Sequence, residues 1–206
     1  MDITTLGLLV FIGAWALQHR YQSARVRLLS QHFGPFQIEQ LMAQLHQAYF
    51  RALDETDAQR AAPIWAAQAG LEQKLSQQMT AFSHDFAQIY LAKTQVFKLA
   101  LPLPYADQLF PRLCFDARLV FAVHAQGIAR AVQFTTAPAQ RARALLAELY
   151  LMQHTCHWFC RSLPTASARL LARHQTSYEQ VLEAVHPQTR RDYLKLVARK
   201  PSQISG

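Results

Sequence analysis

Residues 71–89 read LEQKLSQQMTAFSHDFAQI, and the spacing of their apolar residues decides the fold class. The apolar positions recur at intervals of four, four, three, four and three residues: Leu71, Leu75, Met79, Phe82, Phe86 and Ile89. Because an α-helix turns once every 3.6 residues, this spacing predicts one apolar stripe along a helix of about 27 residues. We expect this amphipathic helix to be able to pair with a partner protein.

Prolines divide the rest of the chain into helix-length segments. The 206 residues include nine prolines but only six glycines, and apolar and polar residues seldom alternate, which argues against β-sheets. Further helices are predicted over residues 36–53, 113–132 and 138–163, followed by three short ones. The sequence therefore predicts an all-α fold, a helical bundle of about five to seven helices.

Local signals predict several helix boundaries. Gly34-Pro35 should end a first helix that starts near the N-terminus. Pro138 suits the first turn of a later helix, with Thr136 as its N-cap, and Pro164 should end that helix. A capping box over residues 176–179 and the position of Pro187 predict the starts of the last two helices, the second with Thr189 as its cap.

The N-terminal residues 3–17 read ITTLGLLVFIGAWAL and contain no charged side chain. Fifteen helical residues extend about 22 Å, short of the roughly 30 Å hydrocarbon core of a bilayer, and continuing to Tyr21 adds length. Trp15 and Tyr21 suit a membrane interface, and Arg20 can extend toward the headgroups. The sequence therefore predicts an N-terminal transmembrane anchor helix over residues 1–21.

Two other interpretations of this segment exist. Ala14-Trp15-Ala16 has the form of a signal-peptidase site, but Asp2 stands where a signal peptide needs Lys or Arg. The second alternative is a buried helix in a soluble protein. The arginines after the apolar run favour an uncleaved anchor in a bacterial inner membrane, with its N-terminus outside. Residues 22–35 would extend the helix to its break, residues 36–200 would form a cytoplasmic helical domain, and residues 201–206 a disordered tail.

Most of the excess positive charge lies near the C-terminus. The chain has 21 basic and 13 acidic residues, and residues 137–206 hold ten of the basic and four of the acidic ones. A basic stripe at helical spacing is formed by Arg190, Arg191, Lys195, Arg199 and Lys200. The stripe predicts contact with an anionic lipid surface, with a solvated helix face as the alternative. Specific nucleic-acid binding is not favoured, because no aromatic residues are interleaved with the charges.

The richest cluster of ligand-type side chains lies between His154 and Cys160. His154, His157 and Cys160 are three residues apart, so one helix face could present them to a metal ion or haem. The spacing matches neither a zinc finger nor the C-x-x-C-H haem motif. Cys156 falls on an apolar seam with Met152, so we interpret this segment as core packing and expect no metal or cofactor. Three cysteines in all indicate a reducing compartment rather than a disulfide framework.

Motifs for catalysis are absent from the sequence. Asp54-Glu55-Thr56-Asp57 lacks the glycine of a calcium loop and is interpreted as a solvated turn. Phosphate-binding loops, dinucleotide fingerprints, nucleophile elbows and H-E-x-x-H are not found. The sequence therefore predicts a membrane-anchored interaction, scaffold or accessory protein without catalytic activity, which binds a protein partner or itself. The alternatives are a metal- or haem-binding protein that uses the His154–Cys160 cluster and a soluble nucleic-acid-binding protein.

Overall fold

The computed structural model describes residues 2–100, 103–133 and 137–198. Helix accounts for 83% of the described residues, which confirms the all-α prediction. The elements follow in chain order: α1 (Ile3–Phe33), α2 (Ile38–Asp54), α3 (Ala58–Ala87), α4 (Leu91–Thr94), β1 (Gln95–Phe97), α5 (Ala106–Leu109), the 3₁₀ helix η1 (Pro111–Leu113), β2 (Cys114–Asp116), α6 (Ala117–Gln133), α7 (Pro138–Cys160), α8 (Leu163–His174), α9 (Tyr178–Ala184) and α10 (Pro187–Val197). Ten α-helices in this described part exceed the predicted number, partly because α4 and α5 are single turns without a periodic pattern.

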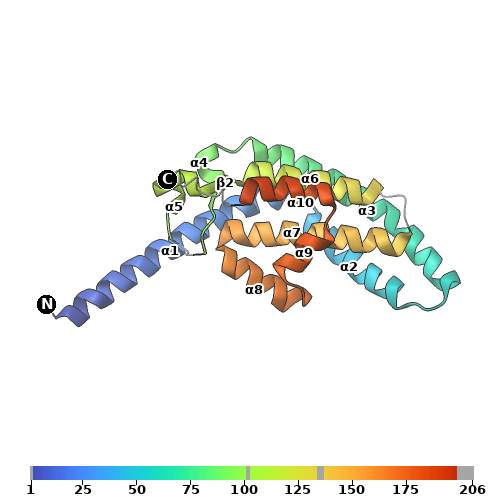
Figure 1. Ribbon diagram of the computed structural model, residues 1–206, viewed down its shortest axis with the longest axis horizontal. Helices are drawn as coiled ribbons and strands as arrows, with labels where there is room; N and C mark the ends of the chain where they lie inside the picture. The colour runs from blue at the N-terminus through green and yellow to red at the C-terminus, as the bar shows by residue number, and fades with distance from the viewer. Residues whose placement is uncertain (1, 101–102, 134–136, 199–206) are drawn as a thin grey trace, which may run out of the picture.

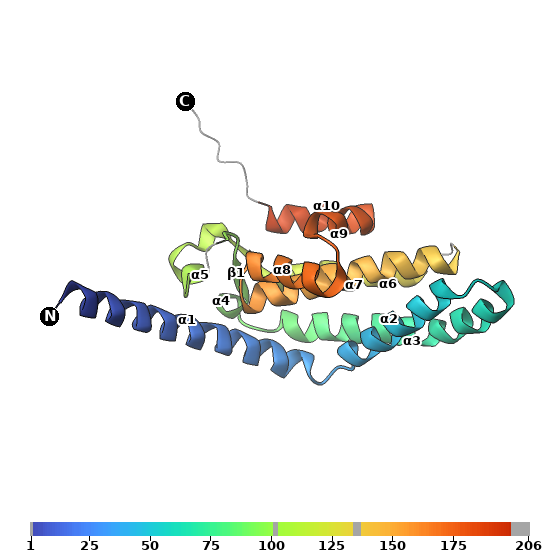
Figure 2. The same cartoon turned by 90° about the horizontal axis from the view of Figure 1, so that it is seen from below.

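The helices α3, α6 and α7 form the centre of the bundle. Helix α2 packs on α3, α8 and α9 pack on α7, and α10 lies along α6 (Figure 1 and Figure 2). The central helices meet in a cluster of four aromatic rings: Phe82 and Phe86 of α3, Phe121 of α6 and Phe159 of α7. Neighbouring ring centroids in this cluster are 4.9 to 5.8 Å apart, in the range of favourable aromatic packing.

The apolar stripe of α3 is used inside the protein. The side chains of Leu75, Met79, Phe82 and Phe86 are fully buried, because neighbouring helices cover this face of α3. The helix itself is predicted correctly, but the expectation that its stripe pairs with a partner protein is wrong. Its apolar area already stabilises the fold of this chain.

A short antiparallel pair of strands, β1 and β2, departs from the all-helical expectation. Val96 is paired with Phe115 at the centre of the ladder, and both side chains are buried. Each strand is three residues long, too short for an alternating pattern to be recognised. The pairing also joins segments distant in sequence, so no local signal announces it.

Proline and glycine mark the helix boundaries mostly as predicted. Gly34 follows the last residue of α1, Pro138 begins α7 and Pro187 begins α10. The predicted cap Thr136 lies outside the described residues. These boundaries are local effects, since proline fixes its own φ and lacks a backbone donor.

Other predicted caps are corrected by the structure. Helix α9 is capped one residue later than expected, by a reciprocal capping box between Ser177 and Gln180. Pro164 lies in the first turn of α8, whereas α7 already ends at Cys160. The cap of α10 is the His186 ring, whose Nδ1 accepts from the Gln188 backbone N–H at 3.1 Å, and Thr189 lies buried within the helix. Several neighbouring residues could cap each helix, and packing decides which one does.

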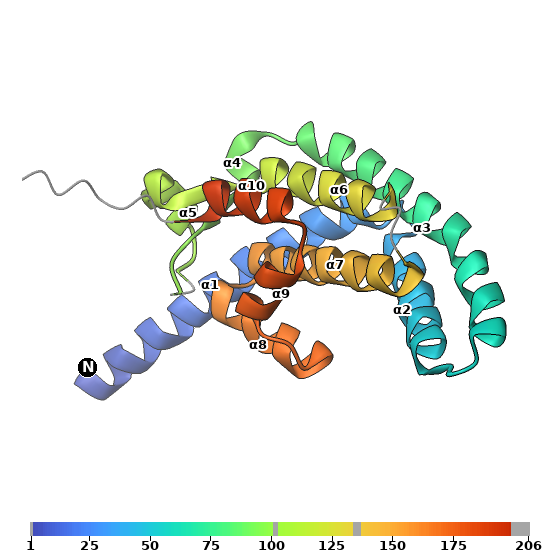
Figure 3. The ribbon, with the colours of Figure 1, turned by 45° about the vertical axis from the view of Figure 1, so that its right-hand side comes forward.

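Helix α1 continues unbroken from Ile3 to Phe33, but its two halves have different surroundings. The C-terminal half packs against α3 and α7, whereas the N-terminal half extends away from the rest of the protein (Figure 1 and Figure 3). Among the described residues, no helix combines the length and the apolar character that crossing a membrane requires. The transmembrane anchor predicted over residues 1–21 is therefore not supported, since Gln18, His19 and Arg20 follow directly after the apolar run.

Candidate functional site

The most unusual surface of the protein is the N-terminal half of α1, residues 3–17, which we call the apolar rod. Nine large apolar side chains of the rod are between 45% and 90% exposed: Ile3, Leu6, Leu8, Leu9, Val10, Phe11, Ile12, Trp15 and Leu17. Soluble monomers seldom expose apolar patches of this extent, so such a surface marks a site of interaction.

The rod is apolar on every side. Residues 8–12 are five consecutive large apolar residues, all exposed. Successive residues of an α-helix point about 100° apart, so these five cover the whole circumference. A helix of this kind differs from an amphipathic helix, which needs only one covered face. The rod therefore fits an environment that surrounds it.

The base of the rod is fixed by Arg25, whose side chain is buried. Arg25 donates from Nε to the carbonyl of Phe159 in α7 at 2.5 Å and from Nη2 to the carbonyl of Gln95 in β1 at 2.8 Å. Its guanidinium also stacks on the Phe159 ring, with the Cζ atom 4.2 Å from the ring centroid. One side chain thus joins α1 to two separate parts of the bundle.

A second set of contacts joins the same turn of α1 to α5. The Tyr21 hydroxyl donates to Asp107 Oδ1 at 2.9 Å and accepts from Arg25 Nη1 at 2.6 Å. Asp107 Oδ2 lies 3.9 Å from Arg25 Nη1, and both charged side chains are under 10% exposed. The Tyr21 ring also packs on Tyr105, with centroids 5.1 Å apart. A buried charge pair that is hydrogen-bonded in this way holds α5 in one place relative to α1.

The C-terminal half of α1 continues into the protein core. Leu29 is buried, and the Phe33 ring meets the Phe82 ring of α3 edge to face at 4.9 Å. His32 Nδ1 lies 2.6 Å from Asp85 Oδ2 at the protein surface. The helix is therefore anchored over its second half, and the rod extends from a rigid base.

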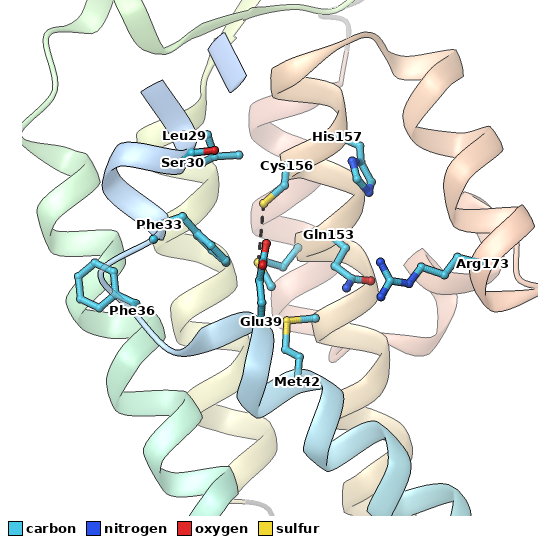
Figure 4. Close-up of a pocket in the computed structure, with 12 residues that line it drawn as sticks. Leu29, Ser30, Phe33, Phe36, Glu39, Met42, Gln153, Cys156, His157 and Arg173 are labelled. Atoms are coloured by element: carbon cyan, nitrogen blue, oxygen red, sulfur yellow. Dashed lines mark hydrogen bonds between the residues drawn. The ribbon is translucent and has the colours of Figure 1, made fainter. Parts of the chain in front are cut away.

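A cleft runs between the C-terminal end of α1, α2, α7 and α8. It consists of two adjoining cavities of about 290 and 370 Å³ that share Glu39, Met42, Gln153 and Arg173 in their walls. Figure 4 shows apolar residues such as Phe33 on the α1 side and His157 with Arg173 on the α8 side. The cleft therefore has an apolar wall that faces a polar one.

The structure separates the members of the predicted His154–Cys160 cluster. His154 is fully buried, with Nε2 3.1 Å from Ser167 Oγ and its ring stacked on Tyr178 at 4.3 Å. His157 instead lies at the cleft, where Nδ1 is 3.2 Å from Arg169 Nη1. Their spacing of three along α7 does not make the two rings converge, because each is oriented by a different neighbour.

The two thiols of this segment are also poorly suited to bind a metal ion. Burial raises the pKa of the Cys160 thiol to about 11, and it raises the pKa of Cys156 further. The thiolate is the form that binds metals, and at neutral pH both thiols stay protonated. Cys156 packs against the edge of the core, with its Sγ atom 3.9 Å from Met152 Sδ. In the described residues, no three His, Cys, Asp or Glu side chains come together as a metal site.

His124 and Glu148 are among the ionisable side chains that are buried inside the bundle. Burial lowers the pKa of His124 to about 3, and its Nε2 lies 2.8 Å from Thr155 Oγ1. Burial raises the pKa of Glu148 to about 7, although its Oε1 accepts the His186 backbone N–H at 3.0 Å. Both side chains have 0% of their surface exposed. They join α6, α7 and the start of α10 through polar contacts in the interior.

The remaining sequence candidates lie on the surface. Arg190, Arg191 and Lys195 are exposed on α10, and Lys195 lies 3.6 Å from Asp192. The other two residues of the basic stripe, Arg199 and Lys200, lie outside the described residues. In the acidic segment 54–57, Asp57 caps α3 by accepting the backbone N–H of Gln59 at 2.9 Å.

Sequence reasoning missed the residues that fix the rod. In the sequence, Arg25 is only one of the arginines that follow the apolar run, although Tyr21 lies one helical turn before it on the same face. Asp107 lies in a proline-rich connector and has no local signal. Asp107 pairs with Arg25, which lies 82 residues earlier in the sequence, and only folding brings the two side chains together.

Comparison with known proteins gives no further guide to function. The chain matches no protein family, no curated protein and no solved structure. The function must therefore be inferred from the chain's own surfaces.

Proposed function

We propose that this protein is a membrane-attached helical adaptor, whose apolar rod inserts into a lipid bilayer and whose helical body is held at the surface to bind other proteins. The single observation that carries the proposal is the exposed rod with apolar side chains on all its faces. A bilayer surrounds an inserted helix completely, as such a rod needs. A helix lying flat in the interface would instead show one polar face.

The magnitude of the apolar area supports insertion. Burial of one large apolar side chain contributes about 1.5–3 kcal/mol, so the rod side chains together could contribute on the order of 10 kcal/mol or more. The rod's backbone is helical, so its N–H and C=O groups are mostly satisfied within the helix, as a hydrocarbon environment demands.

The residues at the end of the rod fit a membrane interface. Trp15 stacks on His19 with ring centroids 5.7 Å apart, and Arg20 follows exposed in the next position. Tryptophan and arginine are both typical of the region between hydrocarbon and water. The arginines after the rod favour the cytoplasmic side of a bacterial inner membrane for the helical body, because positive residues are retained there.

The rigid base explains how an inserted rod would position the body. Arg25 and Tyr21 tie α1 to three other elements, so the body would keep one orientation relative to the bilayer. The C-terminal end of α10 lies toward the side of the body from which the rod leaves (Figure 1 and Figure 2), so Lys195 in its last turn would be the described stripe residue nearest to a bilayer that the rod enters. Contact of the stripe with anionic lipid remains a prediction. No specific observation favours the metal, haem or nucleic-acid alternatives.

The test is membrane retention of the full chain and of a variant lacking residues 2–18. We expect the full chain to stay with membranes through a high-salt or carbonate wash and the shortened chain to be released. The matched control replaces Leu171 and Phe50, two exposed apolar residues of the body, with Ser, and it should be retained like the natural chain. Recovery of the full chain in the soluble fraction would refute the proposal.

The adaptor part of the proposal needs its own measurement. The Arg173→Glu variant keeps the natural rod but reverses the charge of one wall of the cleft. We expect this variant to lose the proteins that crosslink to the natural chain in membranes. Identical crosslinked partners for both chains would argue against a role of this cleft.

A further inference from the structure

A second group of exposed apolar side chains lies at the end of the body from which the rod leaves. Residues 103–110, which we call the α5 segment, include Leu103, Tyr105, Leu109 and Phe110 with exposed fractions of 46%, 36%, 71% and 47%. Figure 2 shows α5 as the part of the body that reaches furthest toward the free end of α1. The segment has no covering element on its outer side among the described residues.

The α5 segment cannot move independently of the rod. Asp107 lies within the segment and is bound to Tyr21 and Arg25 of α1 through the buried contacts described above. Leu103 lines a small cavity together with Gln18 and Tyr21, so it lies beside the first turn after the rod. An inserted rod would therefore carry the segment to a fixed depth.

That depth falls in the headgroup layer. Gln18 directly follows the last rod residue, and Tyr21 lies four residues, or about 6 Å, beyond Leu17 along the helix. A bilayer is about 40–45 Å thick with a hydrocarbon core of about 30 Å, which leaves about 5–8 Å of interface on each side. With Leu17 at the hydrocarbon boundary, the residues that touch Gln18 and Tyr21 lie within this interface.

The charges around the segment suit an anionic lipid surface. Arg20, Lys93 and Arg112 are exposed, and within the described part of the chain none lies within ion-pair distance of a carboxylate. The two acidic residues of this region, Asp107 and Asp116, are both paired with arginine. The surface therefore combines apolar side chains with unneutralised positive charge, as interfacial membrane contacts do.

We propose that the α5 segment is a second membrane contact, at which Leu103, Leu109 and Phe110 enter the interfacial layer of a bilayer that contains anionic phospholipids. This inference rests on insertion of the rod, because the rod sets the depth. Two contacts that are fixed relative to each other restrict rotation of the body about α1. The rod thus attaches the protein, and the α5 segment orients it.

The experiment uses tryptophan fluorescence of the full chain in vesicles of phosphatidylcholine and phosphatidylglycerol. In a Trp15→Phe background, Leu109→Trp places a reporter on the α5 segment, and Leu171→Trp places a matched reporter on α8, where Leu171 is 54% exposed. Trp158 is buried and Trp65 is partly buried against the core, and both contribute the same background to the two reporter variants. Lipids brominated near the glycerol end of their chains should quench the reporter at position 109 and leave the reporter at position 171 unchanged.

The outcomes separate the two proposals. If brominated lipid quenches natural Trp15 but not the reporter at 109, the rod inserts and the α5 inference is wrong. If neither is quenched, insertion of the rod itself fails. A blue shift of the reporter at 109 without lipid, growing with protein concentration, would show that a second copy covers this surface and would also overturn the inference.

A binding measurement gives independent support. Leu109→Ser with Phe110→Ser should weaken partition into the anionic vesicles by about tenfold, since partial burial of two large side chains is lost. Phe50→Ser with Leu171→Ser removes comparable exposed apolar area elsewhere and should leave partition unchanged. Unfolding curves in urea show whether each variant remains folded. Equal partition of both folded double variants would contradict the proposed contact.

Discussion

The apolar rod exposes apolar side chains and the interior of the helical body buries several polar ones, which is the reverse of the usual arrangement. The rod exposes nine large apolar side chains, whereas the body buries Arg25, His124, Glu148 and His154. In the rod, the apolar residues have no neighbours to pack against, so they contribute little to the folding of this chain. In the body, each of these four side chains has at least one hydrogen-bond partner from another element. The comparison teaches that burial here follows tertiary contacts rather than residue type.

This contrast separates attachment from stability. Substitutions in the rod should change membrane retention and leave the free energy of unfolding nearly unchanged. Substitutions of the buried polar residues should do the reverse.

The largest expected effect on stability comes from Arg25→Met. Removal of the guanidinium leaves Asp107 buried without its cation and leaves two backbone carbonyls without their donor. Breaking a buried ion pair costs about 3–5 kcal/mol of unfolding free energy, which urea denaturation would measure. Arg27→Met, on the exposed side of the same helix, should cost under about 0.5 kcal/mol. Equal effects of the two substitutions would show that the base of the rod is not fixed as described.

Two leucines of α1 compare its halves directly. Leu29→Ala removes a buried side chain from the core and should cost about 2–5 kcal/mol. Leu9→Ala removes an exposed side chain of the rod and should leave the unfolding free energy of the lipid-free protein within about 0.5 kcal/mol. A large loss from Leu9→Ala would mean that the rod packs against protein in solution.

Glu148 should make stability depend on pH. Its pKa rises from 4.5 in the unfolded chain to about 7 in the folded one, mainly through burial. A raised pKa stabilises the fold at pH values below 4.5, and this contribution is lost as the pH rises through 7. Glu148→Gln cannot ionise and therefore avoids this loss. The free energy of unfolding of the variant, relative to that of the natural chain, should rise by about 2–3 kcal/mol from pH 5 to pH 8.

The buried histidines act in the opposite direction but do not obscure this comparison. Their lowered pKa values stabilise the fold at neutral pH, and that contribution is lost as the pH falls through the range below 6.5. They are present in both chains, so their effect cancels in the difference. If the difference in unfolding free energy between the two chains stays constant from pH 5 to pH 8, Glu148 is not held in a low-dielectric site.

Among the substitutions of packed residues, the smallest effect on stability is expected from Cys156→Ala. The thiol packs at the edge of the core beside the cleft, so its loss leaves a small space that solvent can partly fill. The cost should be about 1 kcal/mol, measured by thermal or urea unfolding. A cost above about 3 kcal/mol would indicate that Cys156 belongs to the interior in the same way as Leu29.

The sequence by itself determined the helical class, the apolar rod and many of the helix boundaries. Each of these features depends on residues that are close together in the chain. The stripe of α3 follows from the 3.6-residue period of its apolar positions. The boundaries at Gly34, Pro138 and Pro187 follow from the backbone conformations that glycine and proline favour or exclude. The exposed apolar composition of residues 3–17 was likewise visible without a structure, although its ability to cross a membrane was overestimated.

Only the tertiary structure decided which of these features is covered. The α3 stripe and the rod both look like apolar surfaces that need a partner, yet α2 and α6 cover the first, and the second stays exposed. The pairing of Arg25 with Asp107, the β1–β2 ladder and the burial of Glu148 join segments far apart in sequence. Such contacts depend on how helices pack in space, and the energy of each group depends on the neighbours that packing supplies, which no local pattern encodes.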